Sequence, residues 1–256
     1  MAAIENVNKA DLIDGLVRGI SVLNAFNREH PQHTASSLAA VLDMSRAAAR
    51  RFLITLDHLG LAATDGRVYW LTPKMLSFSH NYQSAEQLVR TVQPHLHTLM
   101  QSVGETVTFG IIDGDDILYV ARATGPRLLT TNIGPGARLP LQCAAAGWAI
   151  MAHWPSVDFN RWLQSVTLHK YTPHSLVNKK ALEKRMLNAR TEGYVLLESQ
   201  FEMGMRGMSA AVTNASGRVV GGITVAMAAS VCTPNEAVTR FAAPLKDAAA
   251  KLANYL

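Results

Sequence analysis

Apolar residues recur every three or four positions near the start of the chain, which is the spacing of one buried helix face. The first such run spans residues 12–26. After a connection through Pro31 and His33, two shorter helices are predicted, over residues 35–42 and from Arg46 to about Leu59. Thr34 and Ser45 stand immediately before them, where a side-chain oxygen can accept a free backbone N–H as an N-cap.

The pattern then changes from helical spacing to alternation. Gly60 is the expected helix end, and short strands are predicted over residues 61–63 and 68–71 around an Asp65-Gly66 turn. Three helices followed by such a hairpin form a winged helix-turn-helix, which we place at residues 10–73. Residues 74–88 are mostly helical but weakly patterned, as expected for a linker helix.

The rest of the chain, residues 89–256, mixes strands with helices. Alternation and glycine-containing turns predict strands, and helical spacing with Thr233-Pro-Asn-Glu236 as a capping box predicts the last helix. The predicted strands cover residues 106–112, 117–123, 128–133, 207–213 and 219–227, and the predicted helices cover residues 141–153, 178–192 and 234 onward. Hairpins of this kind indicate an α+β fold class with an antiparallel sheet.

Composition restricts the class of protein. The chain has 256 residues, 48% of them hydrophobic, and two cysteines. Two cysteines exclude a disulfide framework. No apolar run reaches the ~18 residues of a membrane span, and the first residues lack the order of a signal peptide. We therefore expect a cytoplasmic protein that does not enter the membrane.

Charge is concentrated locally. The net charge is +5, yet residues 1–80 hold eight Lys or Arg against seven Asp or Glu. Arg46, Arg50 and Arg51 nevertheless share one side of the third helix with Ala47, and Arg67 stands beside the hairpin turn. A guanidinium binds phosphate or the edge of guanine bidentately, although clustered arginines can also be only a solvated face. The predicted DNA-binding residues are Thr34, Ser45, Arg46, Ala47, Arg50, Arg51 and Arg67.

Several segments resemble one known family. Residues 16–23 and 45–56 are similar to the N-terminal part of IclR-type transcriptional regulators, and residues 136–147 and 192–212 are similar to two motifs of their C-terminal part. The chain departs from the usual pattern at Asp43-Met44, where glycine is common, and at Trp148, Gly207 and Ala211. The resemblance spans nearly the whole chain in the same order.

This resemblance implies a GAF-like effector-binding domain. By motif, its pocket would use Leu128, Ala145, Ala146, Leu197, Met205, Gly207, Thr224 and Ala226. Arg206 could hold a ligand carboxylate or form a surface salt bridge. The run Ala144-Ala-Ala-Gly147 either opens the start of a helix to an anion or packs tightly on the sheet. Residues 225–229 resemble the branch that senses aromatic acids, so an aromatic carboxylate is the expected effector.

The sequence contains few features that would support an enzyme. It contains no Gly-x-Ser-x-Gly elbow and no nucleotide-binding glycine fingerprint. Cys143 has no catalytic partner nearby, and His95 and His97 would point apart on a helix. We expect no enzyme activity, no cofactor and no metal. The expected partners are operator DNA, the small acid, a second copy in a dimer or tetramer, and RNA polymerase. The rival interpretations are a ligand sensor without DNA function and a regulator that responds to a short non-aromatic acid.

Overall fold

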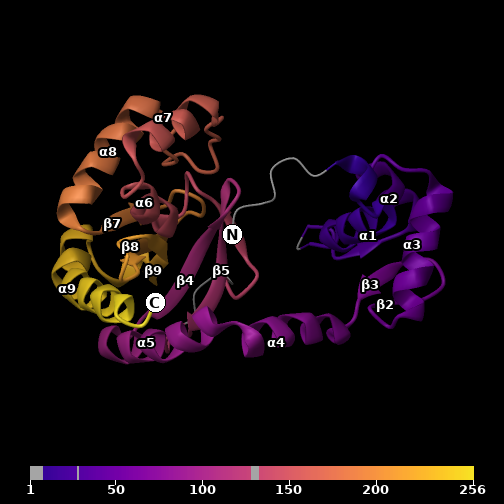
Figure 1. Ribbon diagram of the computed structural model, residues 1–256, viewed down its shortest axis with the longest axis horizontal. Coiled ribbons are helices and arrows are strands. Elements are labelled where there is room, and N and C mark those ends of the chain that lie inside the picture. The colour runs from indigo at the N-terminus through magenta and orange to yellow at the C-terminus, as the bar shows by residue number, and fades with distance from the viewer. Residues whose placement is uncertain (1–7, 28, 128–132) are drawn as a thin grey trace. The chain divides into compact units, whose positions relative to one another are not determined.

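The computed structural model describes residues 8–27, 29–127 and 133–256, and it divides the chain into two compact units, residues 1–82 and 83–256 (Figure 1). The N-terminal unit has one hydrophobic core, and the C-terminal unit has two. Within the described residues, no helix is long and apolar enough to cross a bilayer.

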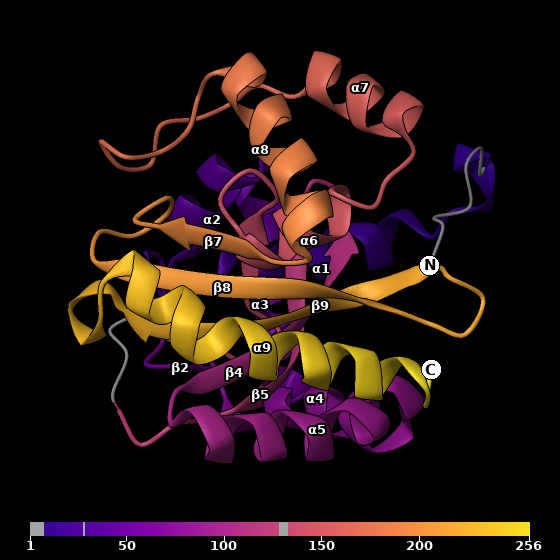
Figure 2. The same cartoon turned by 90° about the vertical axis from the view of Figure 1, so that its left-hand side faces the viewer.

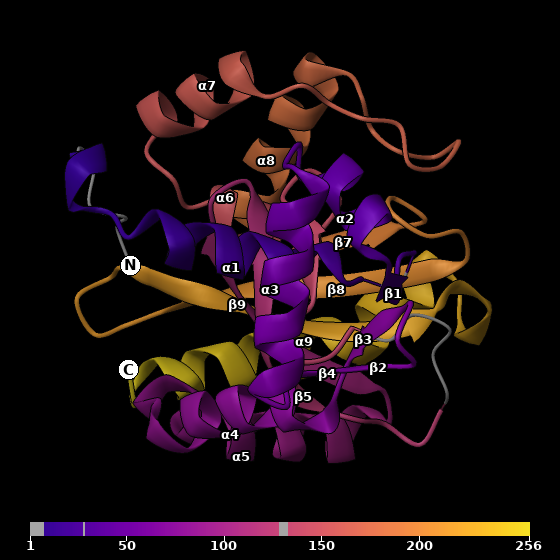
Figure 3. The ribbon, with the colours of Figure 1, turned by 90° about the vertical axis from the view of Figure 1, so that its right-hand side faces the viewer.

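The N-terminal unit is a winged helix-turn-helix, as predicted. Its elements are η1 (Lys9–Asp11), α1 (Asp14–Ala25), β1 (Gln32–His33), α2 (Ala35–Val41), α3 (Arg46–His58), β2 (Ala62–Thr64), β3 (Tyr69–Leu71), η2 (Pro73–Met75) and α4 (Leu76–Ala85), which ends beyond Tyr82. The predicted connection at Pro31 and His33 is wrong in one respect. Gln32 and His33 form a third strand, which pairs antiparallel with β3 and gives the order β1-β3-β2 (Figure 3).

Both predicted N-caps are present. The Thr34 hydroxyl accepts a hydrogen bond from the Ser37 N–H at 3.1 Å, and the Ser45 hydroxyl accepts one from the Ala48 N–H at 3.2 Å. Each cap satisfies one backbone donor that the first turn of a helix leaves free. Gly60, at φ +70°, follows α3 in the left-handed conformation that glycine adopts without a steric penalty. These signals therefore fix where the two helices of the motif begin and where the wing starts.

The C-terminal unit is built on one six-stranded antiparallel sheet with the order β6-β5-β4-β9-β8-β7. Its elements are α5 (Gln87–Val103), β4 (Thr106–Asp113), β5 (Asp116–Ala123), β6 (Arg138–Pro140), α6 (Ala145–Met151), α7 (Ser156–Ser165), α8 (Lys179–Glu192), β7 (Val195–Glu198), β8 (Met205–Thr213), β9 (Val219–Ala228), η3 (Ala229–Val231) and α9 (Pro234–Ala253).

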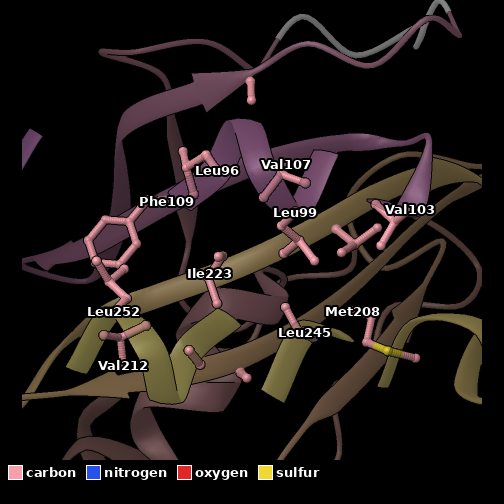
Figure 4. Close-up of a cluster of buried hydrophobic side chains, with 14 of the residues drawn as sticks. Leu96, Leu99, Val103, Val107, Phe109, Met208, Val212, Ile223, Leu245 and Leu252 are labelled. Atoms are coloured by element: carbon pink, nitrogen blue, oxygen red, sulfur yellow. The ribbon is translucent and has the colours of Figure 1, made fainter. Parts of the chain in front are cut away.

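Helices cover both faces of this sheet. Helices α5 and α9 lie side by side on one face (Figure 2). There, side chains such as Leu96, Phe109, Ile223 and Leu245 form a fully buried core (Figure 4). Helices α6, α7 and α8 belong to a second core on the opposite face. That second face also holds the cavity described below.

The structure shortens one predicted helix. Helix α6 begins at Ala145 and not at Leu141, because residues 141–144 form a turn. The Trp148 indole donates to the carbonyl of Gln142 at 2.9 Å, which keeps that carbonyl out of the helix. A β-carbon on Gly147 would lie 2.8 Å from the Leu141 carbonyl oxygen. The missing side chain therefore lets the turn pack back onto the helix. The predicted strand 128–133 lies almost wholly outside the described residues.

Candidate DNA-binding surface and effector site

Helix α3 separates a buried side from a charged exposed side. Ala49 and Leu53 are fully buried against the rest of the N-terminal unit, while Arg46, Ala47 and Arg50 are exposed. Helical periodicity accounts for this division, since the two sets lie on opposite faces. The second helix of the motif therefore presents its arginines to solvent, as a helix that enters the major groove of DNA must.

The charge on this surface is available for a partner. Among the described residues, none forms an ion pair with the guanidinium group of Arg46, Arg50 or Arg51. Ser45, exposed at the start of the helix, and Ala47, which has only a methyl group, leave room for close approach. Thr34 is half-buried, and its hydroxyl is engaged in the cap of α2.

The wing carries Arg67 at its tip. Asp65 closes the turn by accepting hydrogen bonds from the backbone N–H groups of Val68 and Arg67, each at 2.8 Å. These backbone hydrogen bonds, that of Val68 first, lower the pKa of the Asp65 carboxyl, and the Arg67 charge adds to the effect. The rigid turn leaves the Arg67 side chain exposed.

A cavity opens on the sheet face that α6 covers. Its empty volume is about 670 Å³, part of which is open to solvent. Strands β4, β5, β8 and β9 form its floor, and the start of α6 and the connection between β7 and β8 form its walls. Its lining residues are Thr106, Thr108, Tyr119, Arg122, Ile133, Leu139, Cys143, Ala144, Ala145, Leu197, Ser199, Gln200, Phe201, Glu202, Met205, Arg206, Gly207, Thr224 and Ala226.

Most of the residues expected at the effector site line this cavity. They are Ala145, Leu197, Met205, Arg206, Gly207, Thr224 and Ala226. Ala146 is not among the lining residues. It packs on β9 instead, where a β-carbon on Gly222 would come within 3.0 Å of the Ala146 β-carbon. Leu128 lies outside the described residues. The small-residue run therefore has two roles. Ala144 and Ala145 line the cavity, whereas Ala146 packs on β9 and Gly147 packs against Leu141.

Arg206 is engaged by the protein itself. Its Nε donates to Glu198 Oε2 at 2.8 Å, and its Nη1 donates to the carbonyl of Cys232. The arginine side chain is 3% exposed, whereas that of Glu198 is 43% exposed. The expected surface salt bridge is therefore present, but its cationic half is buried. Because Glu198 balances its charge, Arg206 is a weak partner for a ligand carboxylate.

The wall between β7 and β8 is held by a buried hydrogen-bond network. The Ser175 hydroxyl donates to the carbonyl of Gln200 at 2.6 Å, and the Gln200 side chain accepts from the Leu176 N–H at 2.8 Å. Ser199 adopts φ +53°, a backbone conformation that is uncommon for residues other than glycine. These contacts fix the position of Phe201 and Glu202 at the cavity.

Sequence reasoning missed the residues that β4 and β5 contribute: Thr106, Thr108, Tyr119 and Arg122. Alternation places Thr106 and Thr108 on one side of their strand, but the sequence does not say which side faces a cavity. Burial raises the pKa of Tyr119, which keeps its phenol protonated. No group of three or more His, Cys, Asp or Glu residues that could hold a metal ion occurs in the part of the chain that the structure describes.

An exposed arginine face on a winged helix-turn-helix, together with a cavity in a separate unit, defines a ligand-responsive DNA-binding protein. Comparison with known proteins identifies the family. The model of the bacterial transcriptional regulator IclR C-terminal domain matches residues 80–254, and that of the IclR helix-turn-helix domain matches residues 15–66. The chain belongs to the IclR family, and it is a DNA-binding transcriptional regulator.

Individual relatives agree with this assignment. The Pca regulon regulatory protein of Pseudomonas putida is 31% identical over 247 residues, which cover 96% of this chain and 85% of the relative. A crystal structure of a transcriptional regulator from Rhodococcus sp. RHA1 has a TM-score of 0.83 and 30% identity, covering 94% of this chain and 97% of that one. An IclR homologue from Microbacterium hydrocarbonoxydans, solved with 4-hydroxybenzoate, has a TM-score of 0.75 and 20% identity, covering 93% and 97% of the two chains.

Proposed function

We propose that the cavity binds a small aromatic carboxylic acid and that this acid controls how the regulator acts at its operator, in a catabolic operon. The observation that carries the proposal is the cavity itself. Mostly apolar walls with a few polar groups among them are the usual make-up of a small-molecule site. Leu197, Met205, Ala226 and Ala145 give it apolar walls, which suit an aromatic ring better than a short polar acid.

The relatives support the same ligand class. The Microbacterium homologue was crystallised with 4-hydroxybenzoate, which is a compact aromatic acid. A ligand shifts an equilibrium only by the difference in its affinity for two states. The acid must therefore bind the operator-competent and the operator-incompetent states of the regulator with different affinities.

For operator recognition, we propose that the exposed face of α3 lies in the major groove. Arg46, Ala47 and Arg50 would face base edges, while Ser45, Arg51 and the wing Arg67 would contact phosphates. The exposure of all six residues and the absence of ion pairs at the α3 arginines among the described residues support this assignment. Thr34 is the weaker candidate, because it is half-buried and both its hydroxyl and its backbone N–H are engaged with Ser37 in the cap of α2.

We also propose that the regulator acts as a dimer, because one winged domain covers only a half-site. Helix α1 offers a suitable surface. Ile13, Leu16 and Ile20 are 72%, 62% and 50% exposed and lie on one side of the helix, together with Val17. Contiguous exposed apolar side chains of this kind mark interaction surfaces. A symmetric dimer buries the same patch of both copies.

Calorimetry with the full-length protein tests the effector. The protein is titrated with benzoate, 4-hydroxybenzoate and 3,4-dihydroxybenzoate, and in parallel with glyoxylate, pyruvate and xylose. Saturable binding of at least one aromatic acid, with weaker or no binding of the other compounds, is expected. Binding confined to the keto acids or the sugar would overturn the proposal. Ala145→Leu, which fills the cavity, serves as a matched variant and should lose the binding.

A further inference from the structure

The bulge in strand β5 brings two polar side chains to the same side of the sheet. Phe109 of β4 pairs with Ala121, and the next residue, Gly110, pairs with Tyr119, so that Val120 is left without a partner in this ladder. Val120 and Ala121 both belong to the core under α5 and α9. As a result, Tyr119 and Arg122 both face the cavity, although residues three apart in a regular strand face opposite sides.

The register continues this polar row across the neighbouring strands. Arg122 pairs with Thr108, and Thr108 pairs with Thr224. Directly paired residues have β-carbons about 4.5–5.5 Å apart. Glycine is required at position 110 by Ile117, since a β-carbon there would lie 2.5 Å from Ile117 Cγ2 and in ordinary van der Waals contact with the Tyr119 ring.

Two hydroxyl groups of this row have unused hydrogen-bonding capacity. Tyr119 is 4% exposed and Thr108 is 3% exposed, yet in the described part of the chain neither side chain has a hydrogen-bond partner. The Thr224 hydroxyl, in contrast, donates to Ser209 Oγ at 3.0 Å. Neither hydroxyl oxygen is among the buried atoms that lack a partner, so both are accessible from the cavity, where they can donate to a ligand atom that accepts hydrogen bonds.

The charges around the cavity are segregated. Arg122 lies on β5, where its Nη1 donates to the carbonyl of Ile133 at 2.9 Å. Glu202 lines the cavity from the connection between β7 and β8, and β5 is separated from β8 by β4 and β9. Arg122 therefore places a positive charge at the β5 end of the cavity, where it favours a ligand carboxylate.

We propose that Arg122, Tyr119 and Thr108 form the subsite that binds the carboxylate of the effector. The neutral phenol and the threonine hydroxyl donate one hydrogen bond each, and the guanidinium supplies the opposite charge. The ring of the ligand then lies toward Leu197, Met205 and Ala226. This inference rests on the proposed aromatic acid effector. It assigns the specificity for acids to β4 and β5, and not to the start of α6 or to Arg206.

Calorimetry on full-length variants tests the subsite. Each acid of the aromatic series is compared with its primary amide, for example 4-hydroxybenzoate with 4-hydroxybenzamide. Tyr119→Phe keeps the ring over Gly110 and removes only the hydroxyl, so it should weaken acid binding about tenfold and amide binding by much less. Arg122→Gln should weaken acid binding more strongly and abolish the preference for the acid over the amide.

Two variants away from the cavity serve as controls. Tyr194→Phe and Arg218→Gln should bind the acid with the affinity of the wild-type protein. Circular dichroism and the thermal midpoint establish that each variant is folded; if Arg122→Gln does not fold, Tyr119→Phe carries the test alone. Wild-type affinity for the acid in Tyr119→Phe, or an equal loss for acid and amide, overturns the subsite. Failure of the wild-type protein to bind any aromatic acid would instead overturn the proposed effector class and, with it, this subsite.

Discussion

At the scale of single residues, the DNA-binding hypothesis rests on where the guanidinium groups are. Arg46 and Arg50 are exposed on α3 beside the small side chain of Ala47, and Arg67 is exposed at the tip of the wing. A bidentate contact to a base edge discriminates between base pairs, whereas a phosphate contact contributes affinity that depends on salt. The two kinds of arginine should therefore respond differently to substitution.

Arg46→Ala should relax sequence preference, costing about 1–3 kcal/mol on the preferred duplex and little on a mutated one, because a base contact is lost. Arg67→Ala should weaken both duplexes similarly and reduce the slope of log K against log salt by about 0.9, because a phosphate contact is lost. Fluorescence anisotropy over a salt series measures both quantities, with Arg218→Ala as the control. If both variants change only the salt slope, the base-reading role of Arg46 is wrong.

Cys143 gives a second test at this scale. Burial raises the pKa of its thiol to about 12 from an ordinary value of 9.0. A raised pKa in the folded state means that the thiol favours the folded state below pH 9 and that this contribution is lost as the pH rises toward 12. Because the thiolate is the reactive form, native Cys143 should resist alkylation at neutral and mildly alkaline pH.

Peptide mapping after treatment of the native protein with iodoacetamide at pH 8 checks this expectation. Cys232, which is half-buried, should be modified first, and Cys143 should react only after unfolding in guanidinium chloride. The Cys143→Ser variant identifies the peptide. Modification of Cys143 at the same rate as Cys232 in the folded protein would contradict the account.

At the scale of elements, the sequence predicts what is long and periodic. Helices α1, α3, α8 and α9 and the hairpins β4–β5 and β8–β9 show helical spacing, caps or alternation, and the structure contains them. Strands β1, β6 and β7 have only two to four residues, which is too short for alternation to be recognised, and they lack a turn signal like the Asp65-Gly66 that marks the equally short β2 and β3. Helix α7 was also missed.

The same limit explains what was missed at the candidate effector site. Motif resemblance located residues of β8, β9 and the start of α6. Tyr119 and Arg122 could not be placed together, because a regular strand would separate them and the bulge beside Val120 is a property of the β4–β5 register. Which face of the sheet holds a cavity is decided by the packing of α6, and that packing depends on distant contacts such as Ala146 on Gly222.

Helix α1 supplies a prediction at this scale. Leu16→Glu combined with Ile20→Glu should convert the proposed dimer to a monomer, because charges on the contact would be desolvated and would repel those of the second copy. Light scattering after size exclusion measures the mass. Leu187→Glu, at an exposed leucine of α8, is the control and should leave the dimer intact. An unchanged mass in the double variant would show that α1 does not form the contact.

At the scale of the whole molecule, the two candidate sites lie in different units, which have separate cores. The N-terminal unit carries the arginine surface, and the C-terminal unit carries the cavity. Composition alone argued weakly for DNA binding, since residues 1–80 hold eight basic and seven acidic side chains. The placement of charge on one helix face decides the question, because affinity for DNA follows the contacts that are made. The proposed control by an acid requires that acid binding and operator binding be coupled. The two ligands then favour either the same state of the regulator or different states.

Selection of duplexes from a random pool by the full-length protein tests the central claim most directly. We predict enrichment of an inverted repeat whose half-sites lie about 10 base pairs, or a multiple of one helical turn, apart. We further predict that the protein carrying Arg46→Ala and Arg50→Ala enriches no sequence. A pool that stays random with the wild-type protein, or the same motif recovered with the double variant, would contradict the assignment of operator recognition to α3.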